Sequence, residues 1–218
     1  MLRRILASIG LLSVVWIVPM KAQEEGKFNF NMGGGMGVPL NPTAQFAGVG
    51  GNFVTGAGYN LSKHSALIGQ FMWFGLPPSV GAREQLGGIG ASANAYSITA
   101  NYRYSSGVGH TFGYYLIGGA GWYYRHTSVS QTIPLPPTPV VCQPIWDWYG
   151  FQCVGGAVDF TRSIGAGTSS LGANGGLGFT IRVKDTGWKF YLESRYHYAA
   201  SRLISTQMQP ITFGFSYH

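Results

Sequence analysis

The sequence predicts an all-β fold, an eight-stranded antiparallel up-and-down β-barrel that spans a membrane with its apolar face outward. Three observations predict it. Eight segments alternate apolar and polar residues with the two-residue period of a strand, their connections alternate short and long, and charged residues make up only 10% of the chain. A soluble domain carries roughly 25% charged residues, so this chain has too few to cover a surface in contact with water.

The first four segments cover residues 27–38, 47–60, 64–73 and 96–104. Each sets a mostly apolar face against Gly, Asn, Ser, Thr or basic residues. The apolar faces are Phe28, Phe30, Met32, Met36 and Val38; Ala47, Val49, Phe53, Ala57 and Tyr59; Leu67, Phe71 and Trp73; and Tyr96, Ile98, Ala100, Tyr102 and Tyr104. The third segment is the least regular, because Ile68 and Met72 stand on its other face.

The last four segments cover residues 110–125, 170–182, 187–199 and 211–218. The stretch GWKFYLESRYHYA at 187–199 shows the pattern best, with four ionisable groups on one face. The apolar faces are Phe112, Tyr114, Leu116, Ala120, Trp122 and Tyr124; Leu171, Ala173, Leu177, Phe179 and Ile181; Trp188, Phe190, Leu192, Tyr196 and Tyr198; and Ile211, Phe213, Phe215 and Tyr217.

The turns support this assignment. Paired residues on adjacent antiparallel strands face the same side, and three polar pairs meet this condition across turn-like segments: Asn60 with His64, Arg103 with Thr111, and Arg182 with Lys189. The connections at 75–94 and 126–167 are long, whereas those at 39–45 and 199–209 are intermediate. Short turns on one rim and longer loops on the other, with strands of about 9 to 11 residues, are typical of barrels in an outer membrane.

The apolar face therefore meets lipid, since a closed barrel pairs every backbone polar group without leaving an edge. Eight strands leave a lumen just wide enough for side chains to fill it. We expect Glu193, the only acidic residue in these segments, to lie in the lumen among several basic residues. They are Arg103, Arg125, Arg182, Lys189 and Arg195. A lumen that passes anions is the alternative interpretation of this charge cluster.

Residues 1–22 have the pattern of an export signal, with Arg3 and Arg4 before an apolar run and a cleavage site near Ala22. The remaining domain is 23–218. Its formal net charge falls from +7 to +4 when Arg3, Arg4 and Lys21 are removed, and its basic residues are scattered, so nucleic acid is excluded as a partner. Cys142 and Cys153 favour a disulfide in an exported protein. No spacing indicates a metal site or a cofactor.

The region from 27 to 218 resembles the small outer-membrane β-barrels of Gram-negative bacteria, the eight-stranded OmpA and OmpX type. The resemblance rests on architecture and on the last strand, where Phe213, Phe215 and Tyr217 are similar to the C-terminal assembly signal of that family. It implies recognition by the barrel-insertion machinery and residence among outer-membrane lipids. The family signal usually ends on an aromatic residue, whereas this chain ends on His218.

We expect a non-enzymatic role, either structural, or in interaction through the surface loops, or in small-solute passage. The extracellular partner or solute is unknown. The segment 132–153, with five prolines, aromatic residues and both cysteines, is expected to form a rigid outer loop.

Two alternatives belong to other classes of protein. His126 and Ser128 are similar to the His-x-Ser element of lipid A deacylases, and serine with a histidine base is a sound nucleophile pair. A secreted lipocalin-like barrel would enclose an apolar ligand, but it needs a polar exterior.

Overall fold

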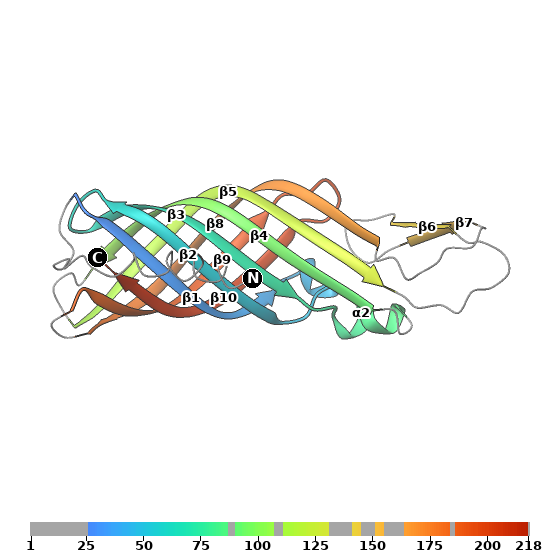
Figure 1. Cartoon of the computed structure of the whole chain (residues 1–218), viewed down its shortest axis with the longest axis horizontal. Helices are drawn as coiled ribbons and strands as arrows, with labels where there is room; N and C mark the ends of the chain where they lie inside the picture. The colour runs from blue at the N-terminus through green and yellow to red at the C-terminus, as the bar shows by residue number, and fades with distance from the viewer. Residues whose placement is uncertain are drawn as a thin grey trace, which may run out of the picture.

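The computed structural model describes residues 26–86, 90–106, 111–130, 141–144, 151–154, 164–183 and 186–217. Eight strands close into one barrel in the order β1-β10-β9-β8-β5-β4-β3-β2, and every neighbouring pair is antiparallel. They are β1 (Phe28–Pro39), β2 (Gly50–Asn60), β3 (Ser65–Leu76), β4 (Gly90–Ser106), β5 (Phe112–Ser130), β8 (Ile164–Arg182), β9 (Trp188–Ala199) and β10 (Thr206–Tyr217). The predicted fold class is confirmed (Figure 1).

Two further strands, β6 (Val141–Pro144) and β7 (Phe151–Val154), pair only with each other and do not join the barrel. A 3-10 turn, η1 (Thr43–Gln45), lies between β1 and β2, and a short helix, α2 (Val80–Gln85), lies between β3 and β4. The helix begins after Ser79, whose hydroxyl accepts a hydrogen bond from the Ala82 amide at 3.1 Å. The barrel therefore has eight strands.

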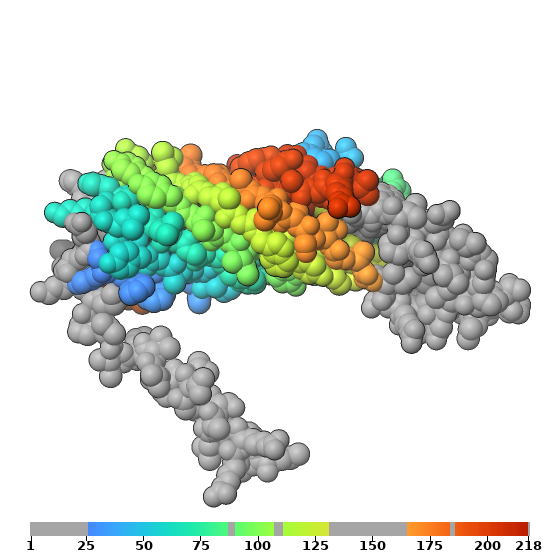
Figure 2. All heavy atoms as spheres, turned by 90° about the horizontal axis from the view of Figure 1, so that it is seen from above, coloured from blue at the N-terminus to red at the C-terminus, as the bar shows by residue number. Residues whose placement is uncertain are grey.

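The predicted faces are correct, because the outward positions carry the apolar side chains. Phe28 is 61% exposed and Phe213 66%, whereas Arg195 is 1% exposed. On the visible face of the space-filling view, strands from early blue to late red lie against one another as a continuous wall (Figure 2). A protein with this surface buries its apolar side chains in hydrocarbon rather than in a core of its own.

Aromatic side chains gather toward both ends of the wall. Near the short turns, the Trp188 and Tyr217 rings lie 5.0 Å apart. Toward the long loops, Trp122 stacks on Tyr124 at 5.8 Å, and the Trp73 indole donates to Asn94 at 3.0 Å. Rings with an apolar body and a polar group suit the boundary between lipid and water.

The turn registers were predicted only in part. Arg182 does pair with Lys189, but Asn60 pairs with Ala66 and Arg103 with Ile117. Both errors shift the register by an even number of residues, so each side chain keeps its face. For Arg103 the cause is strand length, because the pairing of β4 with β5 continues past Arg103 as far as Ser106 with Tyr114.

Three strands extend beyond the predicted length at the long-loop end. β4, β5 and β8 contain 17, 19 and 19 residues, whereas about 9 to 11 residues suffice to cross the membrane. The predicted loops at 75–94 and 126–167 are correspondingly shorter, because pairing continues from Gly90 with Ser130. The long strands β4, β5 and β8 extend this side of the barrel in the direction of β6 and β7 (Figure 1).

Candidate functional site in the barrel lumen

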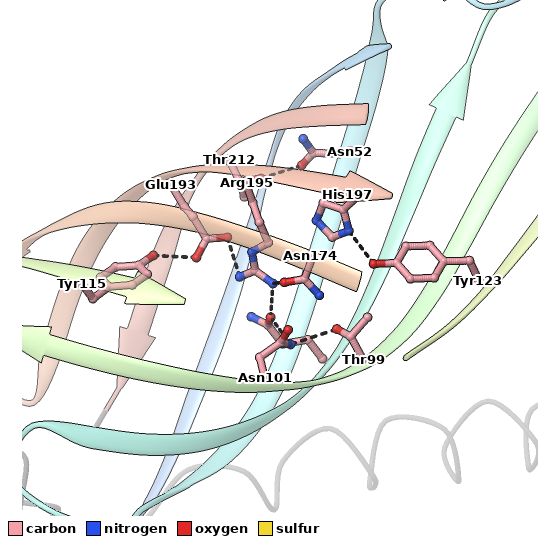
Figure 3. Close-up of polar contacts among 11 residues, drawn as sticks. Asn52, Thr99, Asn101, Tyr115, Tyr123, Asn174, Glu193, Arg195, His197 and Thr212 are labelled. Atoms are coloured by element: carbon pink, nitrogen blue, oxygen red, sulfur yellow. Dashed lines mark hydrogen bonds and ion pairs between the residues drawn. The ribbon is translucent and has the colours of Figure 1, made fainter. Parts of the chain in front are cut away.

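A buried ion pair lies inside the barrel. Arg195 Nη2 is 2.6 Å from Glu193 Oε1, and the two residues face the lumen together because they stand two apart on β9. The Tyr115 hydroxyl, from β5, donates to Glu193 Oε2 at 2.8 Å. Both carboxylate oxygens are therefore engaged by side chains that point toward one another (Figure 3).

The same arginine crosses the lumen. Arg195 Nη1 donates to Gln70 Oε1 at 2.7 Å, and Gln70 belongs to β3, which lies four strands from β9 in either direction around the barrel. Asn101 of β4 also donates to this oxygen at 3.0 Å. These contacts join opposite walls through side chains, as expected for a barrel whose lumen is filled.

The basic residues expected around Glu193 are spread along the lumen. Arg195 contacts Glu193 directly, and the Arg103 guanidinium lies 5.6 Å from the centre of the Tyr115 ring. Arg125 stands ten residues along β5 from Tyr115, roughly 33 Å at about 3.3 Å per residue. The expectation of a single cluster is therefore wrong for Arg125.

Arg182 and Lys189 also lie away from Glu193, toward the short-turn end of the barrel. They pair with each other across β8 and β9 near the short turns. Lys189 stands four residues from Glu193, roughly 13 Å along the strand. Alternation fixed which face each basic residue occupies but not its height in the lumen, since height depends on the register of all eight strands.

Arg125 instead closes a seam near the outer end. β9 ends at Ala199, opposite Gly172, while β8 continues to Ile164, so the wall lacks one strand at this height. Arg125 lies inside, 4% exposed, and its Nη1 donates to the Thr206 hydroxyl at the start of β10. Arg125 pairs with Thr168 of β8, beyond the end of β9, whereas Thr206 pairs with Ala199, the last residue of β9. The hydrogen bond therefore links β5 to β10 beside the outer end of β9.

Sequence reasoning did not single out His197. Its side chain is 1% exposed, and the Tyr123 hydroxyl lies 2.9 Å from His197 Nδ1 (Figure 3). Phe74 packs edge-on against the His197 ring at 5.5 Å. The only signal in the sequence was parity, because His197 shares the inward face of β9 with Glu193 and Arg195.

The outer part of the lumen contains an apolar cluster. Phe74, Leu76 and Met208 point inward with at most 1% exposure. They pack in one cluster with Val54 and with Met72, which alternation had placed on the polar face of its segment. The inward face predicted to be polar is therefore apolar on β3 toward the long loops, whereas the buried Arg125 and Thr127 keep the inward face of β5 polar at the same end.

Two outer connections close over this cluster, and we call them the outer cap: residues 40–49 and 77–86. The cap contributes the buried residues Ala47, Ala82 and Leu86 to the cluster. Ala47 was expected on the lipid face of the second strand, but it precedes β2 and is 1% exposed. The long-loop end of the lumen is therefore covered by apolar side chains.

Backbone hydrogen bonds tie the cap together. Gly48 donates to the Pro77 carbonyl at 2.7 Å, and Ser79 donates to the Phe46 carbonyl at 2.9 Å. The buried Thr43 hydroxyl accepts from the Gln207 amide at 2.8 Å, which fastens the cap to β10. Burial and these ties make the cap part of the folded barrel.

His126 and Ser128, the candidate nucleophile pair, lie on the outward face of β5 and are half-buried. The Ser128 hydroxyl is 2.8 Å from the Ser92 hydroxyl. Within the described residues, no hydrogen bond joins Ser128 to His126. The Ser128 hydroxyl is thus in contact with another serine rather than with a histidine base.

The two cysteines lie at facing backbone positions. Cys142 of β6 and Cys153 of β7 are direct cross-strand partners. Facing residues of an antiparallel pair have Cα atoms about 4.5 to 5.5 Å apart, which is the separation that a disulfide spans. The disulfide between Cys142 and Cys153 stays a prediction, and the backbone register of β6 and β7 is compatible with it.

The three aromatic residues of the predicted C-terminal signal face outward on β10, where this last strand pairs with β1 and closes the barrel. Phe215 pairs with Met32 and Tyr217 with Phe30 across β1 and β10, and the Phe215 ring lies 4.6 Å from that of Phe190. Phe213 is the most exposed of the three. The role of Phe213, Phe215 and Tyr217 in assembly stays a prediction.

The described residues contain neither a cluster of metal ligands nor a helix that spans a membrane. No group of three or more His, Cys, Asp or Glu side chains there could hold a metal ion. In the same ranges, no helix is long and apolar enough to cross a membrane.

A closed eight-stranded wall with an apolar exterior and a filled polar lumen defines a small transmembrane β-barrel protein. The chain belongs to the outer membrane protein β-barrel domain family, whose model matches residues 8–218. It is therefore a bacterial outer-membrane protein. No curated protein matches it.

Solved structures with the same fold are distant in sequence. The attachment invasion locus protein Ail of Yersinia pestis is 14% identical with a TM-score of 0.53, and the match covers 89% of this chain and 100% of Ail. Neisserial surface protein A is 14% identical with a TM-score of 0.57, covering 89% and 99%. A major outer membrane protein from Thermus thermophilus is 9% identical with a TM-score of 0.56, covering 88% and 99%. These likenesses show the fold alone.

Proposed function

We propose that this protein is a non-enzymatic outer-membrane barrel that presents its long loops as an interaction surface and does not pass solutes to the exterior. The observation that supports this is the outer cap, which buries Phe74, Leu76 and Met208 over the long-loop end. Below it, Arg195 joins opposite walls through Gln70. Two successive obstructions in one narrow lumen favour a plug over a pore.

Conductance of the refolded chain in planar bilayers tests the closed lumen. We expect no channel steps from protein whose folded state is verified by its migration on an unheated gel. A porin in the same bilayers serves as the positive control. Regular single-channel steps from the folded chain would overturn the proposal and would support small-solute passage.

Protease treatment of whole cells tests which end faces outward. Barrels of this kind have short periplasmic turns and longer extracellular loops, so we expect cleavage within residues 131–163. A variant that lacks 131–163 should still insert and should resist cleavage under the same conditions. Protection of 131–163 together with cleavage at the 184–187 turn would reverse the orientation.

The non-enzymatic assignment draws support from the position of Ser128, which bonds to Ser92. Mass spectrometry of lipid A from cells with and without the protein should show the same acyl chains. A missing acyl chain in the presence of the protein would favour the lipid-modifying alternative, and loss of that effect in Ser128→Ala would assign it.

Three finer points complete the proposal. Export removes residues 1–22, which N-terminal sequencing of the membrane-inserted protein would establish. Cys142 and Cys153 form a disulfide in the outer segment. The outward row Phe213, Phe215 and Tyr217 is read by the barrel-insertion machinery, so that Tyr217→Ser should slow insertion in cells more than refolding in detergent.

A further inference from the structure

The described strands place five basic side chains and one acidic side chain on the inward face. The acidic residue, Glu193, is already bound on both oxygens, by Arg195 at 2.6 Å and by Tyr115 at 2.8 Å. Among the described residues no ion pair or hydrogen bond joins Glu193 to the other arginine nearby, Arg103, on which the carboxylate acts only at longer range. Burying a cation without a hydrogen-bonded partner is costly.

Arg103 is a buried cation of this kind. Its side chain is 5% exposed, and its Nε and Nη2 atoms have no hydrogen-bond partner among the described residues. The guanidinium lies over the Tyr115 ring at 5.6 Å, a contact that uses the face of the group and leaves its N–H edge available. Two N–H groups on one planar edge match the geometry of an oxyanion.

Other donors stand toward the short-turn end of the lumen. Lys189 faces the lumen from β9, opposite Arg182 on one side and Ser216 on the other. Its positive charge and those of Arg182 and Arg103 repel one another. The hydroxyls of Tyr191 and Ser216 are buried without a hydrogen-bond partner in the described part of the chain. This half of the lumen thus combines positive charge with hydroxyl donors on the side away from the outer cap.

We propose that the periplasmic half of the lumen is a binding site for one small oxyanion, held by Arg103 with Lys189, Tyr191 and Ser216. Water can satisfy the hydroxyls, but only an anion also compensates the buried guanidinium. A lumen of eight strands has room for one small ligand at most.

Phosphate binding to the full-length refolded chain in detergent tests this proposal. We expect sodium phosphate to raise the thermal unfolding midpoint in a saturable way, compared with sodium chloride at equal ionic strength. Arg103→Met should raise the phosphate dissociation constant at least tenfold. Arg125→Met, which alters an equally buried arginine at the outer end, should keep the wild-type response.

Tyr191→Phe and Ser216→Ala supply variants that change neither charge nor backbone if Arg103→Met does not fold. Each should weaken phosphate binding several-fold. Equal effects of phosphate and chloride on both the wild-type chain and a Glu24→Gln, Glu25→Gln double variant would overturn the proposal and leave water as the occupant. A wild-type response that persists in Arg103→Met and in both hydroxyl variants would overturn it as well.

The anion can also come from the chain, since Glu24 and Glu25 precede β1 in the sequence. If their carboxylates fill the site, phosphate should bind only to the Glu24→Gln, Glu25→Gln double variant. If an external oxyanion fills it, that variant and the wild type should bind phosphate alike. A conducting barrel would contradict the proposed function but not this site.

Discussion

Glu193 and Arg195 form an ion pair of 2.6 Å between two side chains of one strand. Their spacing of two residues puts both on the inward face of β9, and Tyr115 and Gln70 complete their hydrogen bonding from β5 and β3. The only acidic side chain of the described strands is thus bound within its own strand and linked to two others.

Removing the carboxylate charge should destabilise the barrel. In Glu193→Gln, Arg195 and Arg103 stay buried without a carboxylate, and we expect a loss of about 3 to 5 kcal/mol in the free energy of unfolding. Urea titration of the refolded protein measures it. The double variant Glu193→Leu, Arg195→Met should lose less than Glu193→Gln, because it removes both charges; a larger loss would contradict this account of the pair.

A side chain added at Gly178 should displace Tyr115. A Cβ at this position collides with the Tyr115 ring, whose hydroxyl holds Glu193. We expect Gly178→Ala to cost about 1 to 3 kcal/mol, the usual range for an overpacked interior. Gly175→Ala on the same strand is the matched control, because nothing lies within 4 Å of its Cβ position. Equal unfolding midpoints for the two variants would contradict the close packing of Tyr115 on β8.

A charge placed on the lipid face should destabilise insertion. Leu192 points outward from β9 and is 50% exposed. Leu192→Arg should cost about 2 to 4 kcal/mol if Leu192 lies near the middle of the bilayer. The measurement is equilibrium unfolding from lipid vesicles. Leu203→Arg, in the 200–205 connection, should change the unfolding free energy little, since this exposed residue lies outside the strands.

The cysteines provide a chemical prediction. Protein isolated from the outer membrane should take up no alkylating reagent at Cys142 or Cys153 after unfolding, unless it is first reduced. Peptide mass spectrometry would identify the linked pair. Cys142→Ser should make Cys153 reactive without reductant. Alkylation of both cysteines in unreduced wild-type protein would refute the disulfide.

Comparison of β9 with β3 shows how far alternation reaches. On β9 one row of side chains is polar and the other is apolar at nearly every residue. The sequence therefore predicted both faces of this strand and the inward direction of Glu193. On β3 the inward row contains Ile68, Met72, Phe74 and Leu76, which resemble lipid-facing residues. Because both faces of β3 are apolar, alternation could not predict the outer cap. Met72, Phe74 and Leu76 are buried in the cluster to which residues 40–49 and 77–86 contribute.

The sequence by itself determined that the chain is an eight-stranded barrel with its apolar side chains outside, because the period of a strand is two and hydrocarbon accepts neither charges nor unpaired backbone groups. Only the tertiary structure decided that Arg195 binds Glu193 and crosses to Gln70, that Arg125 closes the seam at Thr206, and that Arg103 keeps two N–H groups without a partner among the described residues. Those relations depend on the height of each side chain around a closed ring of strands, and that height is fixed by register and loop packing together rather than by any single segment.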